Sequence, residues 1–318
     1  MQAYIIRRLL LLIPTLFLVT VIIFLLVQVI PGTAVDLIIS QIEQNVTTQE
    51  NIDALMRAMG VDVPLHVQYG RWLGGILRGD LGNSLWSGRP VLQELLPRIP
   101  VSIELGFLAI LTGILIALPI GVYSAVRQDT AGDYVARSSA IICLAVPHFW
   151  VATMVIVYPS IWWGWTPPIV YIPFMDDPAG NLRQLLLPAV ILGMHLTGTS
   201  MRMTRTMMLE VLRQDYIRTA WSKGLSERAV ILRHALKNAL IPVVTQIGGQ
   251  ITVVVGSAVV IEQIFGLPGI GSFLIDAINK RDYIMLSGVN LFVAAGVVLT
   301  ILAVDLSYAF LDPRVKYK

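Results

Sequence analysis

The stretch LLLLIPTLFLVTVIIFLLVQVI, residues 9–30, decides the fold class. Of its 22 residues, 18 are Leu, Ile, Val or Phe. At about 1.5 Å per residue, a helix of this length crosses the ~30 Å hydrocarbon core of a bilayer. The run is too long for the core of a signal peptide, and no small-x-small cleavage site follows before Pro31. We therefore expect an uncleaved anchor helix.

Five more apolar runs of similar length follow along the 318-residue chain. They are Val101–Val122, Ser138–Ile161, Leu185–Thr204, Pro242–Ile261 and Met285–Leu306. The composition agrees with lipid as the main solvent, because 56% of the residues are hydrophobic and only 14% are charged, against about 25% in soluble domains. The sequence predicts an all-α membrane protein with six transmembrane helices. A single cysteine, Cys143, excludes an intramolecular disulfide.

The placement of Lys and Arg predicts the orientation in the membrane. Fifteen of the 23 basic residues fall on the side of the N-terminus, and the short loops opposite hold only Arg183, Lys280 and Arg281. The other five lie in the first loop, which is long enough to cross the membrane regardless of charge. We expect both termini in the cytoplasm. Because these basic residues are spread over loops, the net charge of +3 does not indicate nucleic-acid binding.

Three regions follow: an anchor helix at 1–30, an external helical loop at 31–100 and a membrane core at 101–318. In the external loop, Thr47 and Glu50 form a capping-box pattern, and Pro64 starts a second helix. That helix carries an apolar stripe, and a glycine-rich turn follows it. The stripe either packs onto the membrane domain or docks a partner. The candidate docking residues are Trp72, Gly79, Asp80 and Gly82.

A long cytoplasmic loop, 205–240, contains a short capped helix. Asp215 is the expected N-cap and Gly224 the expected stop, with eight helical residues between them. The pairs Tyr216 with Ala220 and Ile217 with Trp221 are spaced i,i+4 and give this helix one apolar face. An exposed Trp and Ile are costly unless they are covered, so a cytoplasmic partner is expected there. A second helix, capped by Ser226, leads into the fifth span.

The segments QDYIRTAWSKGLSE (214–227) and RHALKNALIPVVT (233–245) resemble the cytoplasmic loop of the dipeptide/oligopeptide/nickel permease family. More broadly, they resemble the "EAA" loop of ABC importer membrane subunits. Arg218, Thr219 and Ala220 fall on the Glu-Ala-Ala positions, and Gly224 falls on the loop glycine. Arg-Thr in place of Glu-Ala and a more distant Pro242 are typical of the peptide/nickel branch. The resemblance covers nearly the whole chain and is closest to the B-type subunit.

The resemblance implies an alternating-access importer. The implied partners are a C-type second membrane subunit, two ATP-binding subunits that hold ATP and Mg, an extracytoplasmic solute-binding protein and the lipid bilayer. The short helix would contact an ATPase subunit through Asp215, Tyr216, Ile217, Arg218, Thr219, Ala220, Trp221 and Gly224. This chain has no G-x-x-x-x-G-K-[ST] phosphate loop, so we expect a non-catalytic subunit that binds no cofactor itself. Peptides are the expected cargo, with nickel, glutathione or oligosaccharide as alternatives.

Ionisable residues in or near the spans are candidates for the substrate pathway. They are Glu104, His148, His195 and Glu262. A hydrogen-bonded packing role is the alternative for each histidine. Cys143 and His148 are five residues apart, which is poor spacing for two ligands on one helix, so no metal site is expected.

Small residues recur every four positions in two of the spans, where they favour close packing within the subunit or against a second one. They are Gly113, Ala117 and Gly121 in the second span, and Gly248, Thr252 and Gly256 in the fifth.

Two other protein classes are less well supported. A secondary transporter or channel would be expected to show charged residues deep in its spans or matching broken helices in two halves. Neither is evident in the sequence. An intramembrane enzyme would need paired acids, a His-x-x-x-His motif or a nucleophile elbow, and no span carries one.

Overall fold

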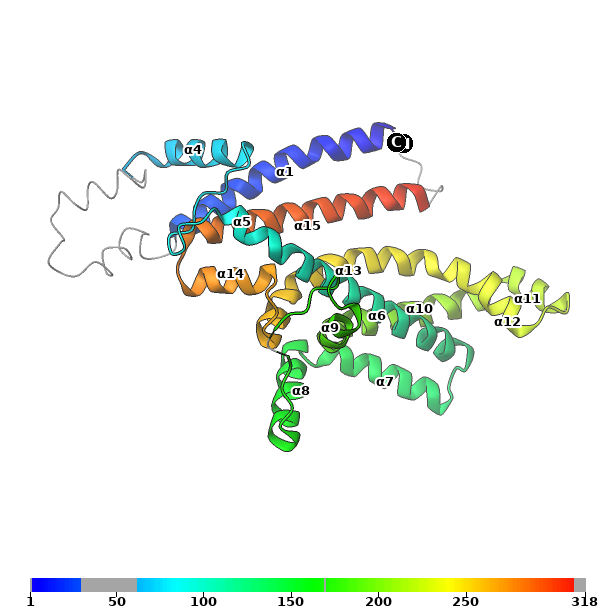
Figure 1. Ribbon diagram of the computed structural model, residues 1–318. Helices are drawn as coiled ribbons and strands as arrows, with labels where there is room; N and C mark the ends of the chain where they lie inside the picture. Colours follow the sequence, from blue (N-terminus) through cyan, green and yellow to red (C-terminus); the bar gives the residue numbers. More distant parts are fainter. Residues whose placement is uncertain (1, 30–61, 169, 312–318) are drawn as a thin grey trace. The chain divides into compact units, whose positions relative to one another are not determined.

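The computed structural model describes residues 2–29, 62–168 and 170–311, and helices dominate this part of the chain (Figure 1). Within it, strand-like pairing is limited to one isolated bridge between Asn83 and Pro90. The predicted all-α class is therefore confirmed for the described residues. The chain forms two compact units, one from Met1–Pro100 with Gly269–Leu299 and one from Val101–Pro268 with Thr300–Lys318.

Four helical segments are long and apolar enough to cross a membrane. They are Ile6–Val29 of α1 (Gln2–Val29), Val91–Val126 comprising α5 (Val91–Leu95), η1 (Leu96–Arg98) and α6 (Ile99–Val126), Glu227–Phe265, and Tyr283–Val304 of α15 (Tyr283–Leu311). Two bent helix pairs raise the number to six if each pair is one span. They are α7 (Ala131–Ala145) with α8 (His148–Trp163), bent by 95°, and α9 (Pro178–Leu192) with α10 (Met194–Leu212), bent by 58°.

These two bends correct the expectation of unbroken third and fourth spans. At the first bend, Val146 is extended (ψ 124°) because the ring of Pro147 disfavours the helical region for the residue before it. At the second, Gly193 lies against α6, where an added Cβ would stand 2.5 Å from the Ala109 carbonyl oxygen. Neither break was evident in the sequence. The breaks fall in two consecutive pairs.

In the first unit, α4 (Leu65–Leu77) lies along α1 through aromatic contacts. The Phe24 ring is 5.4 Å from that of Tyr69 and 5.8 Å from that of Trp72. The Thr20 and Tyr69 hydroxyls are 2.8 Å apart and hydrogen-bonded. Tyr69 and Trp72 of the predicted stripe thus pack against α1, while Leu65 at the start of α4 is 52% exposed. The helix expected after Thr47 lies outside the described residues.

A second cluster of the first unit joins α5 to α14 (Ile270–Asn279) and the start of α15. Its fully buried members include Val91, Leu95, Phe273, Ala277 and Val289. The Arg98 guanidinium stacks 4.2 Å from the centre of the Phe273 ring. The end of the external loop is therefore anchored to residues nearly 200 positions later.

In the second unit, α10 packs against α7 and α13 (Leu236–Phe265). The small-residue stripe of α6 faces α10, because a Cβ on Gly121 would stand 2.9 Å from the Met201 carbonyl oxygen. Packing within the subunit is thus confirmed for that stripe. Gly256, in the second stripe, has open space where a Cβ would lie.

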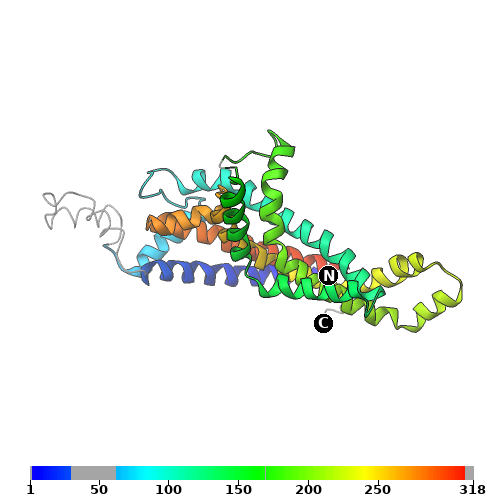
Figure 2. The ribbon, with the colours of Figure 1, turned by 90° about the horizontal axis from the view of Figure 1, so that it is seen from below.

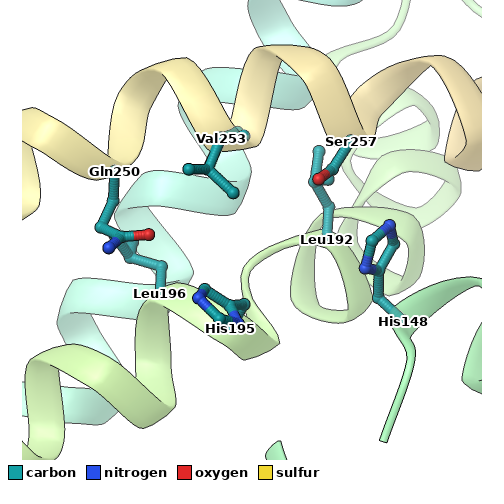
Figure 3. A pocket seen from close by; sticks show the side chains of 8 residues that line it. His148, Leu192, His195, Leu196, Gln250, Val253 and Ser257 are labelled. Carbon is teal, nitrogen blue, oxygen red and sulfur yellow. The ribbon is translucent and has the colours of Figure 1, made fainter. Parts of the chain in front are cut away.

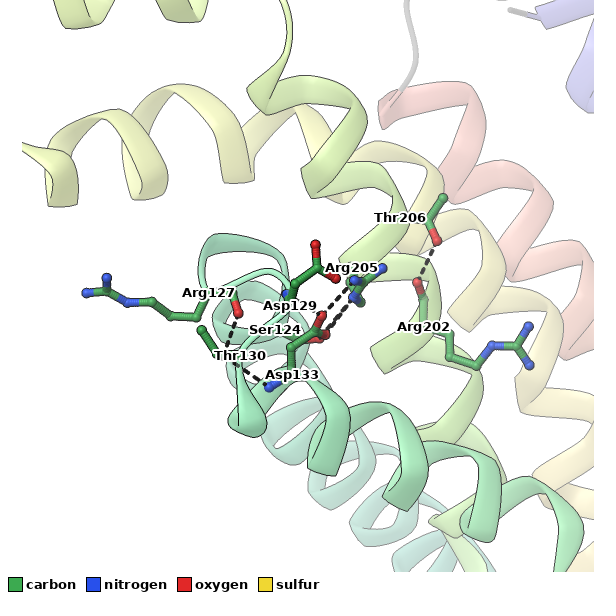
Figure 4. Close-up of polar contacts among 8 residues, drawn as sticks. All are labelled: Ser124, Arg127, Asp129, Thr130, Asp133, Arg202, Arg205 and Thr206. Atoms are coloured by element: carbon green, nitrogen blue, oxygen red, sulfur yellow. Dashed lines mark hydrogen bonds and ion pairs between the residues drawn. The ribbon is translucent and has the colours of Figure 1, made fainter.

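One buried ion pair holds the α6–α7 turn to α10 (Figure 4). Asp133, fully buried, receives two hydrogen bonds from Arg205, 2.9 Å each, from Nε and from the terminal nitrogen Nη2. The Ser124 hydroxyl and the Asp129 backbone N–H also donate to this carboxylate. This one carboxylate therefore ties α6, α7 and α10 together.

Candidate functional site

The predicted cytoplasmic helix exists as α11 (Asp215–Ser222). Its N-cap is Gln214, and Asp215 is the first helical residue, so the expectation that Asp215 caps the helix was wrong. Asp215 still adds a negative charge to the first turn, where the helix dipole favours it. Gly224 has φ +74°, the left-handed conformation expected for a glycine that stops a helix.

The apolar face of α11 divides into an inner and an outer part. Ile217 is fully buried and Ala220 is 7% exposed, and both pack in one cluster with Met208, Val230 and Ala239. The expectation that Ile217 is exposed for a partner was therefore wrong. The i,i+4 rule groups residues on one face but does not say whether the chain itself covers that face.

The outer surface of α11 remains open. Tyr216 and Trp221 are each 44% exposed. Arg218 and Asp215 form an exposed pair 3.3 Å apart on this surface, and Thr219 is exposed as well. The result is a firmly seated helix that presents an aromatic and charged surface.

The seat of α11 is a π-helical turn, η2 (Val230–Ala235), which α12 (Glu227–Ala229) precedes and α13 follows. The Asn238 amide donates to the Tyr216 hydroxyl at 2.9 Å. Figure 2 shows α11 and α12 at the ends of α10 and α13. Because α11 contacts η2 and the first turn of α13, a displacement of α11 would act on the N-terminal end of α13. The predicted second helix is confirmed, but its sequence did not reveal the π-turn.

The glycine-rich turn of the external loop is bound to the loop before α15. The Ser84 hydroxyl donates to Asp282 at 2.6 Å, and the Trp86 indole N–H donates to the Lys280 carbonyl at 2.7 Å. Asp80 accepts from the Gly82 N–H at 2.8 Å, and Gly82 has φ +83°. Sequence reasoning singled out Asp80 and Gly82 but missed Asp282. The proposed docking role of Trp72, Gly79, Asp80 and Gly82 stays a prediction.

Replacing Asp282 with Ala should destabilise the first unit. The Asp282 side chain is fully buried and accepts from Ser84 Oγ, the Leu85 N–H and the Met285 N–H. Each donor left without an acceptor costs about 1–3 kcal/mol. We expect a clear fall in the unfolding temperature of the detergent-solubilised protein. Asp80→Ala, which removes one exposed bond, is the control; equal falls for both variants would contradict the assignment.

Glu104 and Glu262 are both tied to partners in the second unit. Glu104 accepts from the Tyr171 hydroxyl at 2.8 Å and from the Asn181 amide at 3.1 Å. Burial, and then the hydrogen bond to Glu104, raise the pKa of Tyr171 to about 12, so this phenol stays a donor at neutral pH. Glu262 is 1% exposed and accepts from Ser102 at 2.6 Å. These contacts favour a positioning role for both acids.

The two intramembrane histidines, in contrast, share a pocket (Figure 3). His148 is the first residue of α8 and His195 the second of α10, so each follows one of the two helix bends. Gln250 and Ser257 of α13 also line the pocket. Sequence reasoning missed these two, although their i,i+7 spacing places them on one helix face. Within the described residues, no group of three or more His, Cys, Asp or Glu could hold a metal ion.

The sequence as a whole matches two models of one transport family. Residues 117–317 match the binding-protein-dependent transport system inner membrane component, and residues 1–106 match the N-terminal part of such membrane components. The chain belongs to this family. It is thus a multi-pass inner-membrane permease subunit. Permeases of this family belong to transport systems that depend on a binding protein.

Full-length relatives of this permease carry names from peptide transport. A permease protein of Brucella abortus (strain 2308) named for a peptide transport system is 40% identical over 317 residues, with 100% of both chains covered. The dipeptide transport system permease protein DppB of Escherichia coli (strain K12) is 37% identical over 341 residues, again with 100% of both covered. DppB of Alkalihalophilus pseudofirmus is 38% identical over 337 residues, with the same coverage.

One solved structure shows the same fold. The crystal structure of an amino acid ABC transporter with histidines matches with a TM-score of 0.52 at 15% identity. The match covers 70% of this permease and 95% of that chain.

Proposed function

We propose that this permease forms half of a translocation pathway that imports di- and oligopeptides at the expense of ATP hydrolysed on partner subunits. The observation that supports this most is full-length similarity, at 37–40% identity, to permeases named for peptide or dipeptide transport. The partners it needs are a second permease subunit, two ATP-binding subunits that carry ATP and Mg, and a solute-binding protein. The chain itself would bind no cofactor.

The contact with an ATPase subunit is assigned to the open surface of α11. Exposed Tyr216 and Trp221 offer aromatic anchors, which are enriched at the centres of protein interfaces. Arg218 and Asp215 offer a charged rim. Because Ile217 and Ala220 seat the helix on η2, a push on α11 would move it with the base of α13. In this way, closure of the ATP-binding subunits on ATP would be transmitted through α11 to the membrane-spanning helix α13.

Uptake by the reconstituted complex tests the function. Liposomes holding this permease with its partner subunits should accumulate a radiolabelled dipeptide when ATP is inside and the binding protein outside. Nickel, glutathione and an oligosaccharide serve as competing solutes. Uptake of one of those without peptide uptake would overturn the peptide assignment while leaving the family intact.

The proposed orientation can be read by thiol labelling in a Cys143→Ser background. His66→Cys lies on exposed α4, and Ser226→Cys lies in the exposed cytoplasmic loop. An impermeant maleimide should label the first in intact cells and the second only after lysis. Ser84, which is 5% exposed, would be an unsuitable labelling site. The reverse labelling pattern would refute the orientation derived from the basic residues.

A further inference from the structure

The pocket beside α13 combines apolar walls with four hydrogen-bonding side chains. Its volume is about 90 Å³. Leu192, Leu196, Val253 and Val254 form the walls, and His148, His195, Gln250 and Ser257 supply the polar groups. In the described part of the chain, these four side chains make no hydrogen bond to one another. They are therefore available to a ligand.

The position of the pocket coincides with both breaks of the bent helix pairs. His148 follows the break at Pro147, and His195 follows the break at Gly193. Gln250 lies half-way along α13, the 30-residue helix that faces them. Non-helical backbone at membrane depth is tolerated only where protein buries it or where it lines a cavity. The break at Gly193 is buried against α6, and the residues that follow both breaks line the pocket, so the two bends account for how the histidines reach it.

The chemistry of the lining selects among ligands. A neutral imidazole, an amide and a hydroxyl each donate and accept hydrogen bonds. The lining includes no Asp, Glu, Lys or Arg, so it carries no fixed charge. Such a set matches a peptide backbone, which presents N–H donors, carbonyl acceptors and a terminal carboxylate whatever its side chains are. Two imidazoles are fewer than the three or four side-chain ligands with which proteins usually hold a transition-metal ion such as zinc.

We infer that this pocket is a contact point for the transported peptide, with His148, His195 and Gln250 pairing with its backbone amides or terminal carboxylate. The inference rests on the proposed function and adds the place where substrate meets this chain. Ser257 completes the polar rim, while the leucine and valine side chains offer apolar contacts beside it.

Disulfide trapping tests the contact directly. In the Cys143→Ser background, Val253→Cys places a thiol in the pocket, and Val244→Cys places one on α13 about 180° away at 100° per residue. The two valines are 46% and 41% exposed, so this chain's own packing covers them to a similar extent. The probe is an alanyl-cysteine dipeptide activated as a mixed disulfide. We expect an adduct at Val253→Cys that needs ATP and the binding protein, and none at Val244→Cys.

Transport by polar-to-apolar variants is the second measurement. His195→Leu and Gln250→Leu should lower peptide uptake at least tenfold while the ATPase rate stimulated by loaded binding protein persists. His195→Asn, which keeps a donor and an acceptor, should recover much of the uptake. Thr153→Val on α8 is the control, because Thr153 already bonds to the Phe149 carbonyl at 2.9 Å.

The outcomes separate this inference from the proposed function. If the parent complex imports no peptide, the proposed function fails. If the parent imports peptide, equal trapping at both cysteines together with normal uptake by the leucine variants would place the pocket off the path and overturn the inference.

Discussion

Replacing Arg205 with Met should destabilise the second unit by about 3–5 kcal/mol, the usual cost of leaving one partner of a buried ion pair alone. Asp133 is fully buried, and the Arg205 side chain is only 17% exposed, so water cannot replace the lost donors freely. The remaining donors to the carboxylate are Ser124 and the Asp129 N–H. We expect a large fall in unfolding temperature in detergent and a reduced yield of folded protein.

Two further variants isolate the charge. Arg202→Met removes a cation one turn earlier on α10, where the side chain is exposed and points away from Asp133 (Figure 4). It should leave the unfolding temperature nearly unchanged. The double variant Asp133→Leu with Arg205→Met removes both charges and should recover most of the lost stability, since apolar replacements of buried pairs are often neutral. A double variant as unstable as Arg205→Met would show that bulk, not charge, governs the site.

Local signals in the sequence predicted two helix ends, the start of α4 and the end of α11. Pro64 directly precedes α4, and Gly224 adopts the positive φ that stops α11. These features depend on the conformational preferences of single residues, which the sequence states directly. The apolar runs could also be identified from the sequence, because the thickness of the hydrocarbon core fixes the length of a span.

Contacts between distant residues could not be predicted in this way. Ser84 and Asp282 are 198 residues apart, and each is an ordinary polar residue in its own segment. The sequence gives no sign either that Asp133 pairs with Arg205, 72 residues away. Only packing decides which polar group meets which, and a single sequence does not record it.

The two helix breaks were missed for a related reason. Proline also occurs inside α1, α6 and α13 of this chain without ending them, at Pro14, Pro119 and Pro242. Membrane helices tolerate proline where neighbouring groups satisfy the freed backbone. Pro147 therefore did not predict a break by itself. The two histidines that follow the breaks stood out as ionisable residues, while Gln250 and Ser257 on α13 looked like ordinary span residues.

Burial decides which residues of α11 can test the proposed ATPase contact. Ala220→Asp would bury a carboxylate against Val230 and Met208. It would therefore destabilise the fold, and a loss of function would not report on a partner contact. Trp221, 44% exposed and on the open surface, is the cleaner target.

Trp221→Ala should abolish coupling to the ATPase subunits. Truncation of an aromatic anchor at an interface costs at least about 2 kcal/mol, roughly thirtyfold in affinity. We expect the ATPase subunits to be lost during co-purification, and peptide uptake to fall below about a tenth of the parent rate. The control is Leu232→Ala, which shortens an apolar residue of similar exposure, 47%, on η2. It should retain both properties.

Gly224 provides the complementary test of how α11 is set. At φ +74°, a Cβ would meet no atom within 4 Å, so Gly224→Ala adds backbone strain of roughly 1 kcal/mol without a clash. Asn tolerates this conformation, so Gly224→Asn should couple better than Gly224→Ala in ATPase assays with loaded binding protein. If the Trp221 and Gly224 variants both hydrolyse ATP and transport at the parent rate, α11 is not the coupling element. The proposed ATPase contact would then have to be sought outside α11.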